Sequence, residues 1–156
     1  VNLVNCGFKP LYGINEKILD YTITTIIKIH DDNKNSKKEA LIIKRYLNER
    51  LNRTSSKNSS FKLIIALKRS QINLGLQKDL STTKYMVSYA AEYKFSDKKG
   101  SITSGKIEKL SSFDLGDSSY ANLVAQESTD RNILKALAQE IVNLVLATNP
   151  RRKLYP

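Results

Sequence analysis

The sequence has one histidine and one cysteine, and their scarcity excludes most common catalytic and metal chemistry. His30 has no second histidine as a partner, so no multi-histidine metal site is possible within the chain. It lies in a polar turn beside Asp31, where a solvated side chain is expected. Cys6 alone can form neither an internal disulfide nor a metal site. The glycines are scattered as turn glycines are, without a Walker loop or a GxGxxG motif. We therefore expect a protein that is not an enzyme and needs no cofactor.

Long apolar runs are also missing from the sequence. No stretch approaches the roughly 18 residues that a transmembrane helix needs, so any membrane association would be through an anchor or a surface. The composition, with 156 residues of which 40% are hydrophobic and 26% charged, is that of an ordinary globular protein. The length is sufficient for one domain with a single core.

The net charge of +11 is unevenly distributed. The excess of lysine and arginine lies in residues 1–103 and in the tail Arg151-Arg152-Lys153, whereas residues 104–149 are slightly acidic. Basic surfaces suit polyanions, namely nucleic acid, anionic lipid headgroups or a phosphorylated glycolipid. Frequent lysine, asparagine and isoleucine are also typical of AT-rich genomes, and charge alone does not choose among the polyanions.

The first part of the sequence predicts a strand followed by a helix. Residues 19–29 alternate with a period of two, which is typical of a half-buried strand. After a polar run, Ser36-Lys37-Lys38-Glu39 has the capping-box pattern of a helix start, so we expect a helix over about 36–53. A polar loop should follow over 53–60. The apolar positions of this helix recur at helical spacing: Ala40, Ile43, Leu47 and Leu51.

Three further strands are predicted after this loop. Apolar residues alternate from Phe61 to Leu67, and Gly75 indicates where the second strand ends. A third strand follows, and Ser96–Gly100 is typical of a hairpin turn into a weaker strand over about 101–110. The third strand has an aromatic-rich stripe made of Tyr85, Val87, Tyr89, Ala91, Tyr93 and Phe95.

The last predicted element is a long helix. Asp117, Ser118 or Ser119 can cap its start, and Asn149-Pro150 should stop it. Its apolar stripe is expected to consist of Leu123, Leu134, Leu137, Ile141, Leu144 and Val145.

This order of elements predicts an α+β fold. Consecutive strands joined by short turns pair antiparallel. Two amphipathic helices on one face of a four-stranded sheet would bury both apolar stripes in one core. We therefore predict a two-layer sandwich in which a mainly antiparallel four-stranded sheet carries two helices on one face, in the order β-α-β-β-β-α.

The tyrosines of the third strand leave a nucleic-acid-binding hypothesis open. In RNA-recognition domains, aromatic side chains on a sheet stack on bases beside basic residues. Alternating aromatics on a central strand are more often part of a core, and the Lys/Arg-Gly-Phe/Tyr-Gly-Phe run of such domains is missing. The predicted element order also differs from β-α-β-β-α-β. A basic nucleic-acid-binding domain is therefore kept as an alternative, and nucleic acid is not the expected partner.

Two segments of the chain resemble a known family. Cys6-Gly7-Phe8-Lys9-Pro10-Leu11-Tyr12-Gly13 resembles the start of mature LptE-type lipoproteins of lipopolysaccharide (LPS) assembly, in which Cys-Gly-Phe precedes the first strand. Ser119–Glu127, followed by Arg131 and an apolar helix, looks like the last helix of alphaproteobacterial members. The element order between these segments also fits. The residues before Cys6 resemble the tail of a bacterial lipoprotein signal, although Asn5 departs from the small residue that usually stands there.

The resemblance implies an outer-membrane lipoprotein that faces the periplasm. Such a protein plugs the lumen of the LptD β-barrel, assists the assembly of that barrel and binds LPS during export. Cys6 would carry the acyl chains, and plugging contacts would supply the second signal that stable anchoring needs. Three parts of the chain follow: an anchor and lead-in over 1–18, a single α+β domain over 19–149, and a basic tail over 150–156.

The resemblance also implies candidate residues for LPS binding. Basic residues in the loop after the second strand have been proposed to touch LPS in this family, and that loop corresponds to Gln77–Leu80, so Lys78 is the first candidate. Lys68, Arg69 and Lys84 lie near it in the sequence. Their side chains could form charge-assisted hydrogen bonds with lipid A phosphates, although each could equally be a solvated surface cation. Another periplasmic lipoprotein adaptor of similar architecture is the second alternative.

Overall fold

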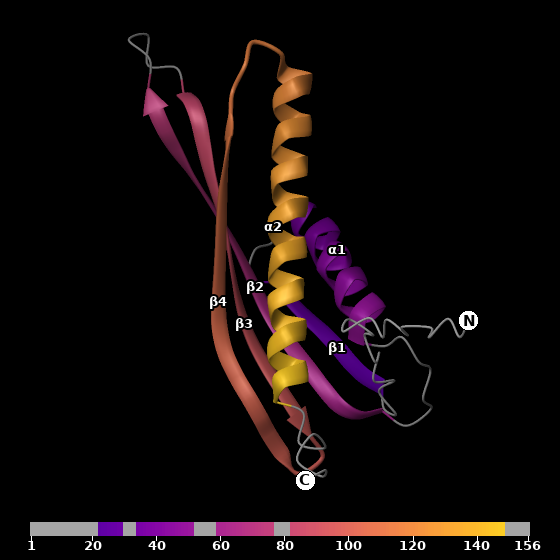
Figure 1. Cartoon of the computed structure of the whole chain (residues 1–156). Coiled ribbons are helices and arrows are strands. Elements are labelled where there is room, and N and C mark those ends of the chain that lie inside the picture. Colours follow the sequence, from indigo (N-terminus) through magenta and orange to yellow (C-terminus); the bar gives the residue numbers. More distant parts are fainter. Residues whose placement is uncertain (1–21, 30–33, 52–58, 77–81, 149–156) are drawn as a thin grey trace, which may run out of the picture.

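The computed structural model describes residues 22–29, 34–51, 59–76 and 82–148. Cys6, Lys78, the basic tail and the predicted boundaries at residues 18/19 and 149/150 lie outside these ranges. The element order is the predicted one (Figure 1). The elements are β1 (Thr22–Ile29), α1 (Lys34–Leu51), β2 (Ser59–Leu76), β3 (Thr82–Asp97), β4 (Gly100–Asp114) and α2 (Ser119–Ala147).

The four strands form one sheet in the order β1-β2-β3-β4. β2 pairs antiparallel with β3, and β3 pairs antiparallel with β4, whereas β1 and β2 are parallel. The parallel pair arises because α1 lies between β1 and β2 in the chain and returns it to the starting end of the sheet. The predicted α+β class with a mainly antiparallel sheet is confirmed.

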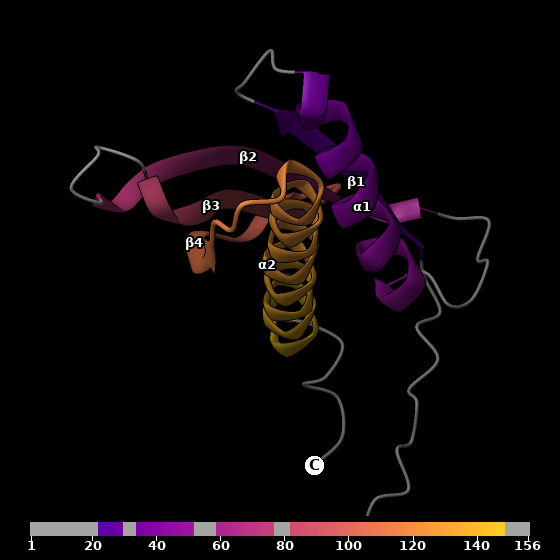
Figure 2. The same cartoon turned by 90° about the horizontal axis from the view of Figure 1, so that it is seen from above.

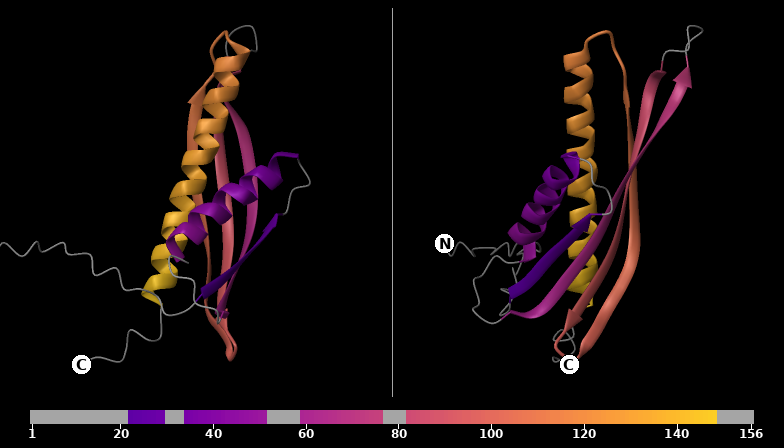
Figure 3. Two further views of the ribbon diagram at one scale, coloured as in Figure 1. Left: turned by 90° about the vertical axis from the view of Figure 1, so that its right-hand side faces the viewer. Right: turned by 180° about the vertical axis from the view of Figure 1, so that it is seen from behind.

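Both helices pack on the same face of the sheet, which gives two layers. α1 contacts β1, α2 contacts β3 and β4, and the two helices contact each other. Seen from above, both helices lie on one side of the curved sheet (Figure 2). The side view shows them in front of the strands (Figure 3, left). Among the described elements, none covers the opposite face, which we call the open face.

The core lies between the helices and the inward positions of the strands. Alternation along each strand places odd-numbered residues of β1, β2 and β3 toward the helices. The aromatic stripe of β3 belongs to this core, because Tyr89 and Phe95 are buried and Tyr85 is half-buried against it. Buried aromatic rings cannot stack on bases, so the platform that the nucleic-acid alternative requires is not on the surface. The phenyl rings of Phe61 and Phe95 stack with centroids 5.4 Å apart.

The local signals at the turns behave as predicted. In the turn between β3 and β4, the Asp97 Oδ1 atom accepts hydrogen bonds from the backbone N–H groups of Lys99 and Gly100, at 2.7 and 2.9 Å. Gly100 has a φ of 146°, and Gly75, one residue before the end of β2, has a φ of 71°. Both values lie in the region that favours glycine over other residues.

The two helix starts differ in how well the sequence predicted them. Ser118 caps α2, because its side chain accepts a hydrogen bond from the Ala121 backbone N–H, in agreement with one of the three predicted caps. The capping box proposed for α1 is wrong. The helix begins at Lys34, so Ser36 lies inside it, and the Glu39 side chain is buried with its carboxylate 3.7 Å from Arg69.

The apolar stripe of α2 is confirmed from Leu134 to Val145, but Leu123 does not belong to it. Leu123 is 54% exposed, whereas Leu134 and Leu137 are fully buried. The reason is geometric: the first turns of α2 extend beyond the start of α1, so α1 covers Leu123 only in part, across a groove (Figure 1).

Gly105 of β4 lies very close to a side chain of the core. It pairs with Tyr93 of β3, and a Cβ at this position would lie 3.0 Å from the ring. We expect Gly105→Val to lower the free energy of unfolding by about 1–2 kcal/mol, because the branched side chain must displace a well-packed ring. Gly116→Val is the control, since a Cβ there meets no atom within 4 Å. Equal losses in urea unfolding of the two variants would contradict this explanation.

Candidate functional site

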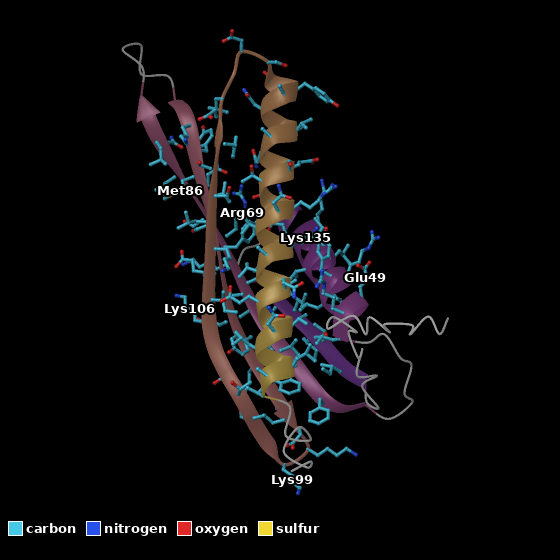
Figure 4. The ribbon with its side chains drawn as sticks, in the orientation of Figure 1. Glu49, Arg69, Met86, Lys99, Lys106 and Lys135 are labelled. Atoms are coloured by element: carbon cyan, nitrogen blue, oxygen red, sulfur yellow. The ribbon has the colours of Figure 1, made fainter. Side chains whose placement is uncertain are left out.

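A buried cluster of charges connects both helices to the sheet. Arg69 of β2 is the centre: its Nε atom lies 3.2 Å from Asp130 Oδ1 of α2 and 3.7 Å from Glu39 Oε1 of α1. The side chains of Arg69, Glu39 and Asp130 are 20%, 10% and 15% exposed. The guanidinium also lies 5.9 Å from the ring centroid of Tyr89 on β3. Four elements of the fold therefore meet at one arginine, which lies between the sheet and α2 (Figure 4).

The hydrogen-bond geometry of this cluster suits a structural role. Arg69 donates from Nε and from a terminal nitrogen to the two oxygens of Asp130, at 3.2 and 3.4 Å, which is a bidentate pair. It also donates to Gln71 Oε1 at 2.9 Å. Partial burial acts to lower the pKa of Arg69, but the charge of Asp130 and its hydrogen bonds outweigh this effect, so the pKa is raised. The arginine stays charged, and its Nε atom and one terminal nitrogen donate to protein groups.

Tyr89 is the neutral member of the cluster. Burial is the main cause that raises its pKa, and the nearby carboxylates of Asp130 and Glu39 add to the effect. Its hydroxyl is buried close to Glu39 and Arg69, but without a hydrogen bond of normal geometry within the part of the chain that the structure describes. The raised pKa keeps the phenol neutral beside the two carboxylates at neutral pH.

This arrangement predicts a loss of stability at alkaline pH. The folded-state pKa of Tyr89 lies above the unfolded value of about 10, so stability is complete below pH 10 and falls as the pH rises above it. At pH 11 the loss due to this group is roughly 1.4 kcal/mol relative to pH 8. Tyr89→Phe removes the titration. We expect the unfolding free energy of the wild type to fall by more than that of Tyr89→Phe between pH 8 and 11; an equal fall in both proteins would contradict the assignment.

A groove between the starts of the two helices adjoins the cluster. Lys38 of α1 and Glu127 of α2 form an ion pair of 2.7 Å across it, and the hydrogen bond from Lys38 lowers the pKa of Glu127. The groove floor contains Ile42, and Leu123 and Arg131 contribute to its wall. This pair is exposed, so it contributes little to stability. Glu39 and Asp130 of the charge cluster also line this groove.

The structure separates the predicted LPS-binding residues. Arg69 points inward into the cluster, whereas Lys68, its neighbour on β2, points to the open face and is exposed. Lys84 lies near the far end of the open face, with its Nζ atom 3.7 Å from Asp114 of β4. Lys78 and Cys6 lie outside the described residues. Arg69 therefore does not share a surface with Lys68 and Lys84, and contact of these residues with LPS stays a prediction.

Sequence reasoning missed a larger set of cations on the open face. Lys28, Lys62, Lys94 and Lys106 come from four different strands, and all are exposed. Three of these lysines stand at strand positions that alternate with the apolar core residues, so the signal was present in the period-two pattern. The pattern could not show that the helices leave this face uncovered, or that the register places lysines of four strands on one surface.

The described residues contain neither a metal-binding cluster nor a helix that could span a membrane. In these ranges no three histidine, cysteine, aspartate or glutamate side chains are placed to hold a metal ion. Neither α1 nor α2 is apolar enough over a sufficient length to cross a membrane. The surface features that remain are the groove and the open face.

Comparisons with known proteins concern the fold. No protein-family model and no curated protein matches the sequence. The solved structure of rare lipoprotein B from Shewanella oneidensis matches with a TM-score of 0.62 at 14% identity, over 85% of this chain and 98% of that one. A candidate lipoprotein from Caulobacter crescentus CB15 matches with a TM-score of 0.57 at 14% identity, over 82% and 93%.

A third structure, a minor lipoprotein from Acinetobacter baumannii, matches with a TM-score of 0.50 at 17% identity, over 81% of this chain and 92% of that one. At such identities the likeness establishes the fold and leaves the activity open. The chain shares the fold of these bacterial lipoproteins over 81–85% of its length.

Proposed function

We propose that this chain is an LptE-type lipoprotein, anchored in the outer membrane and facing the periplasm, which takes part in LPS export. The observation that carries the proposal is the fold match to rare lipoprotein B, which extends over 98% of that protein. The Cys6-Gly7-Phe8 start provides independent support from the sequence. A fold shared over the whole length and a lipoprotein-like start point to the same class of protein.

In this proposal the protein acts by binding and not by catalysis. It occupies the lumen of an LptD-type β-barrel, helps that barrel to assemble and holds LPS during its passage. The net charge of +11 supports an anionic ligand, and phosphate groups of lipid A accept charge-assisted hydrogen bonds from lysine and arginine. The charge cluster around Arg69 has a different role, because its arginine is already paired with Asp130.

The lipid anchor is tested by metabolic labelling with palmitate. The full-length precursor should incorporate the label, and Cys6→Ser should abolish incorporation, because the acyl chains have no other thiol to occupy. Asn5→Ala is the matched control: it restores a small residue before Cys6 and should keep or increase the label. Labelling that persists in Cys6→Ser, or is absent from the wild type, would contradict the anchor.

LPS binding separates this proposal from its alternative, another periplasmic lipoprotein adaptor. Both should carry the anchor, but only an LptE-type protein should bind LPS. We expect Lys78→Glu to weaken LPS binding with the fold intact, as the resemblance implies. Binding of nucleic acid instead, with a steep salt dependence, would support the nucleic-acid alternative.

A further inference from the structure

The open face of the sheet divides along its length into two halves of different chemistry. The half nearer the β3–β4 turn, called the basic half, carries Lys28, Lys62, Lys68, Lys94, Lys106, Glu92 and Glu108, together with the half-buried Ile26 and Ile64. The half nearer the ends of β2 and β4, called the apolar half, carries Ile72, Leu74, Met86 and Leu110, and ends at the ion pair of Lys84 with Asp114. Alternation assigns all these residues to the face opposite the helices.

The basic half has an excess of positive charge that the protein itself does not neutralise. Five lysines stand against two glutamates on this half. Glu92 pairs in register with Lys106, yet none of the five lysines forms an ion pair within the described ranges. Exposed lysines on adjacent strands repel one another, and a bound anion relieves that repulsion.

The apolar half exposes apolar side chains at positions that are usually polar on the solvent-facing side of an antiparallel sheet. Leu110 is 64% exposed and Ile72 is 46% exposed. Met86 lies directly opposite Ile72 in the register of β2 and β3. In Figure 4, Met86 and Lys106 both project from the side of the sheet turned away from α2, whereas Arg69 points toward it. The two halves therefore share one surface.

Small side chains connect the two halves along the central strands. Ala66 and Ser70 of β2 alternate with Lys68, and Ala90 and Ser88 of β3 stand beside them in register. The distance along β3 from Lys94 to Met86 is eight residues, or roughly 26 Å. The result is a continuous strip that is cationic at one end and apolar at the other. A long amphiphile with an anionic head matches this order, whereas a uniformly acidic partner would match only one half.

We propose that LPS lies along the open face, with its phosphates on the basic half and its acyl chains on the apolar half. This inference rests on the proposed function and gives it a location. It places ligand contacts in the middle of the sheet, in addition to the Lys78 contact that the resemblance implies. Lysine ammonium groups donate charge-assisted hydrogen bonds to phosphate oxygens, and apolar contact with Ile72 and Leu110 excludes water from the acyl chains.

The test measures binding of purified LPS to the full chain and to two charge-matched triple variants. Lys62→Glu/Lys94→Glu/Lys106→Glu reverses the basic half. Lys37→Glu/Lys44→Glu/Lys135→Glu makes the same charge change at exposed positions of the two helices, one of which, Lys135, is visible in Figure 4. We expect the first variant to lose about tenfold or more in affinity, and the second less than about threefold.

A double variant of the apolar half keeps the test valid if the first triple variant unfolds. Ile72→Ser/Leu110→Ser changes two exposed side chains and should weaken LPS binding by about tenfold, since it removes apolar area that would contact the acyl chains. Binding of the deacylated, phosphorylated LPS headgroup to this variant should be unchanged. Circular dichroism of each variant verifies the fold.

The outcomes distinguish this inference from the proposed function. Equal losses in the two triple variants, or normal LPS binding by both open-face variants, would overturn the inference and leave the proposed function standing. Loss of a β-barrel partner without loss of LPS binding would also overturn it, because the face would then be a protein interface. Equal affinity for LPS and for phosphatidylglycerol vesicles would contradict LPS as the specific ligand, because the face would then bind anionic lipids in general. No LPS binding by the wild type would contradict the proposed function itself.

Discussion

Arg69→Met should lower the free energy of unfolding by about 2–4 kcal/mol, although arginine is a charged residue that sequence alone would place on the surface. The substitution keeps much of the side-chain volume and removes the guanidinium. Asp130 and Glu39 then remain largely buried without their common partner, and both lie within 4 Å of the vacated Nε position. Unpaired buried carboxylates are costly, because the interior does not replace the hydration that they lose. Urea unfolding followed by circular dichroism measures the loss.

Two companion variants make this prediction specific to the cluster. Lys68→Met removes a charge one position earlier on the same strand, but on the open face, and should change stability by less than about 0.5 kcal/mol. Adding Glu39→Gln and Asp130→Asn to Arg69→Met should recover part of the loss, because the stranded charges disappear. An Arg69→Met variant as stable as the wild type would show that the cluster does not hold the helices to the sheet.

Leu137→Ala should be similarly destabilising, with an expected loss of about 3 kcal/mol. Leu137 is fully buried in the centre of α2, where the helix packs on the sheet. Truncation removes apolar contacts and leaves a cavity that neighbouring side chains fill only in part. Thermal and urea unfolding should both report the change.

Leu123→Ala is the matched control, because it makes the same chemical change in the same helix. Leu123 is more than half exposed, so this variant should lose less than about 1 kcal/mol. The pair thus tests whether the apolar stripe of α2 begins after Leu123, as the structure indicates. Comparable losses in the two variants would mean that the start of α2 is packed more tightly than described.

Local patterns made much of the fold predictable. The period-two alternation of β3, with Tyr89 and Phe95 on the inner side, identified a core strand. The Ser118 cap and the Asp97–Gly100 turn depend on neighbouring residues alone, and they were predicted for that reason. The order of elements then left few ways to bury two helix stripes on one sheet.

The candidate sites were less predictable, because they depend on residues that are distant in the chain. Glu39 fits a local capping pattern, but its actual partner is Arg69, which α1 and β2 bring to it only in the folded state. The lysines of the open face are similar. Their positions on each strand could be read, whereas their assembly requires the register of four strands and the packing of both helices on the other face.

The most direct test of the proposed function is purification of the protein from outer membranes in mild detergent. The chain with Cys6 intact should be recovered in the outer-membrane fraction, together with an LptD-type β-barrel and LPS. Cys6→Ser should weaken the membrane association. Recovery of the wild-type chain from the cytosol with bound nucleic acid, or from the membrane without barrel and LPS, would contradict the proposed role in LPS export.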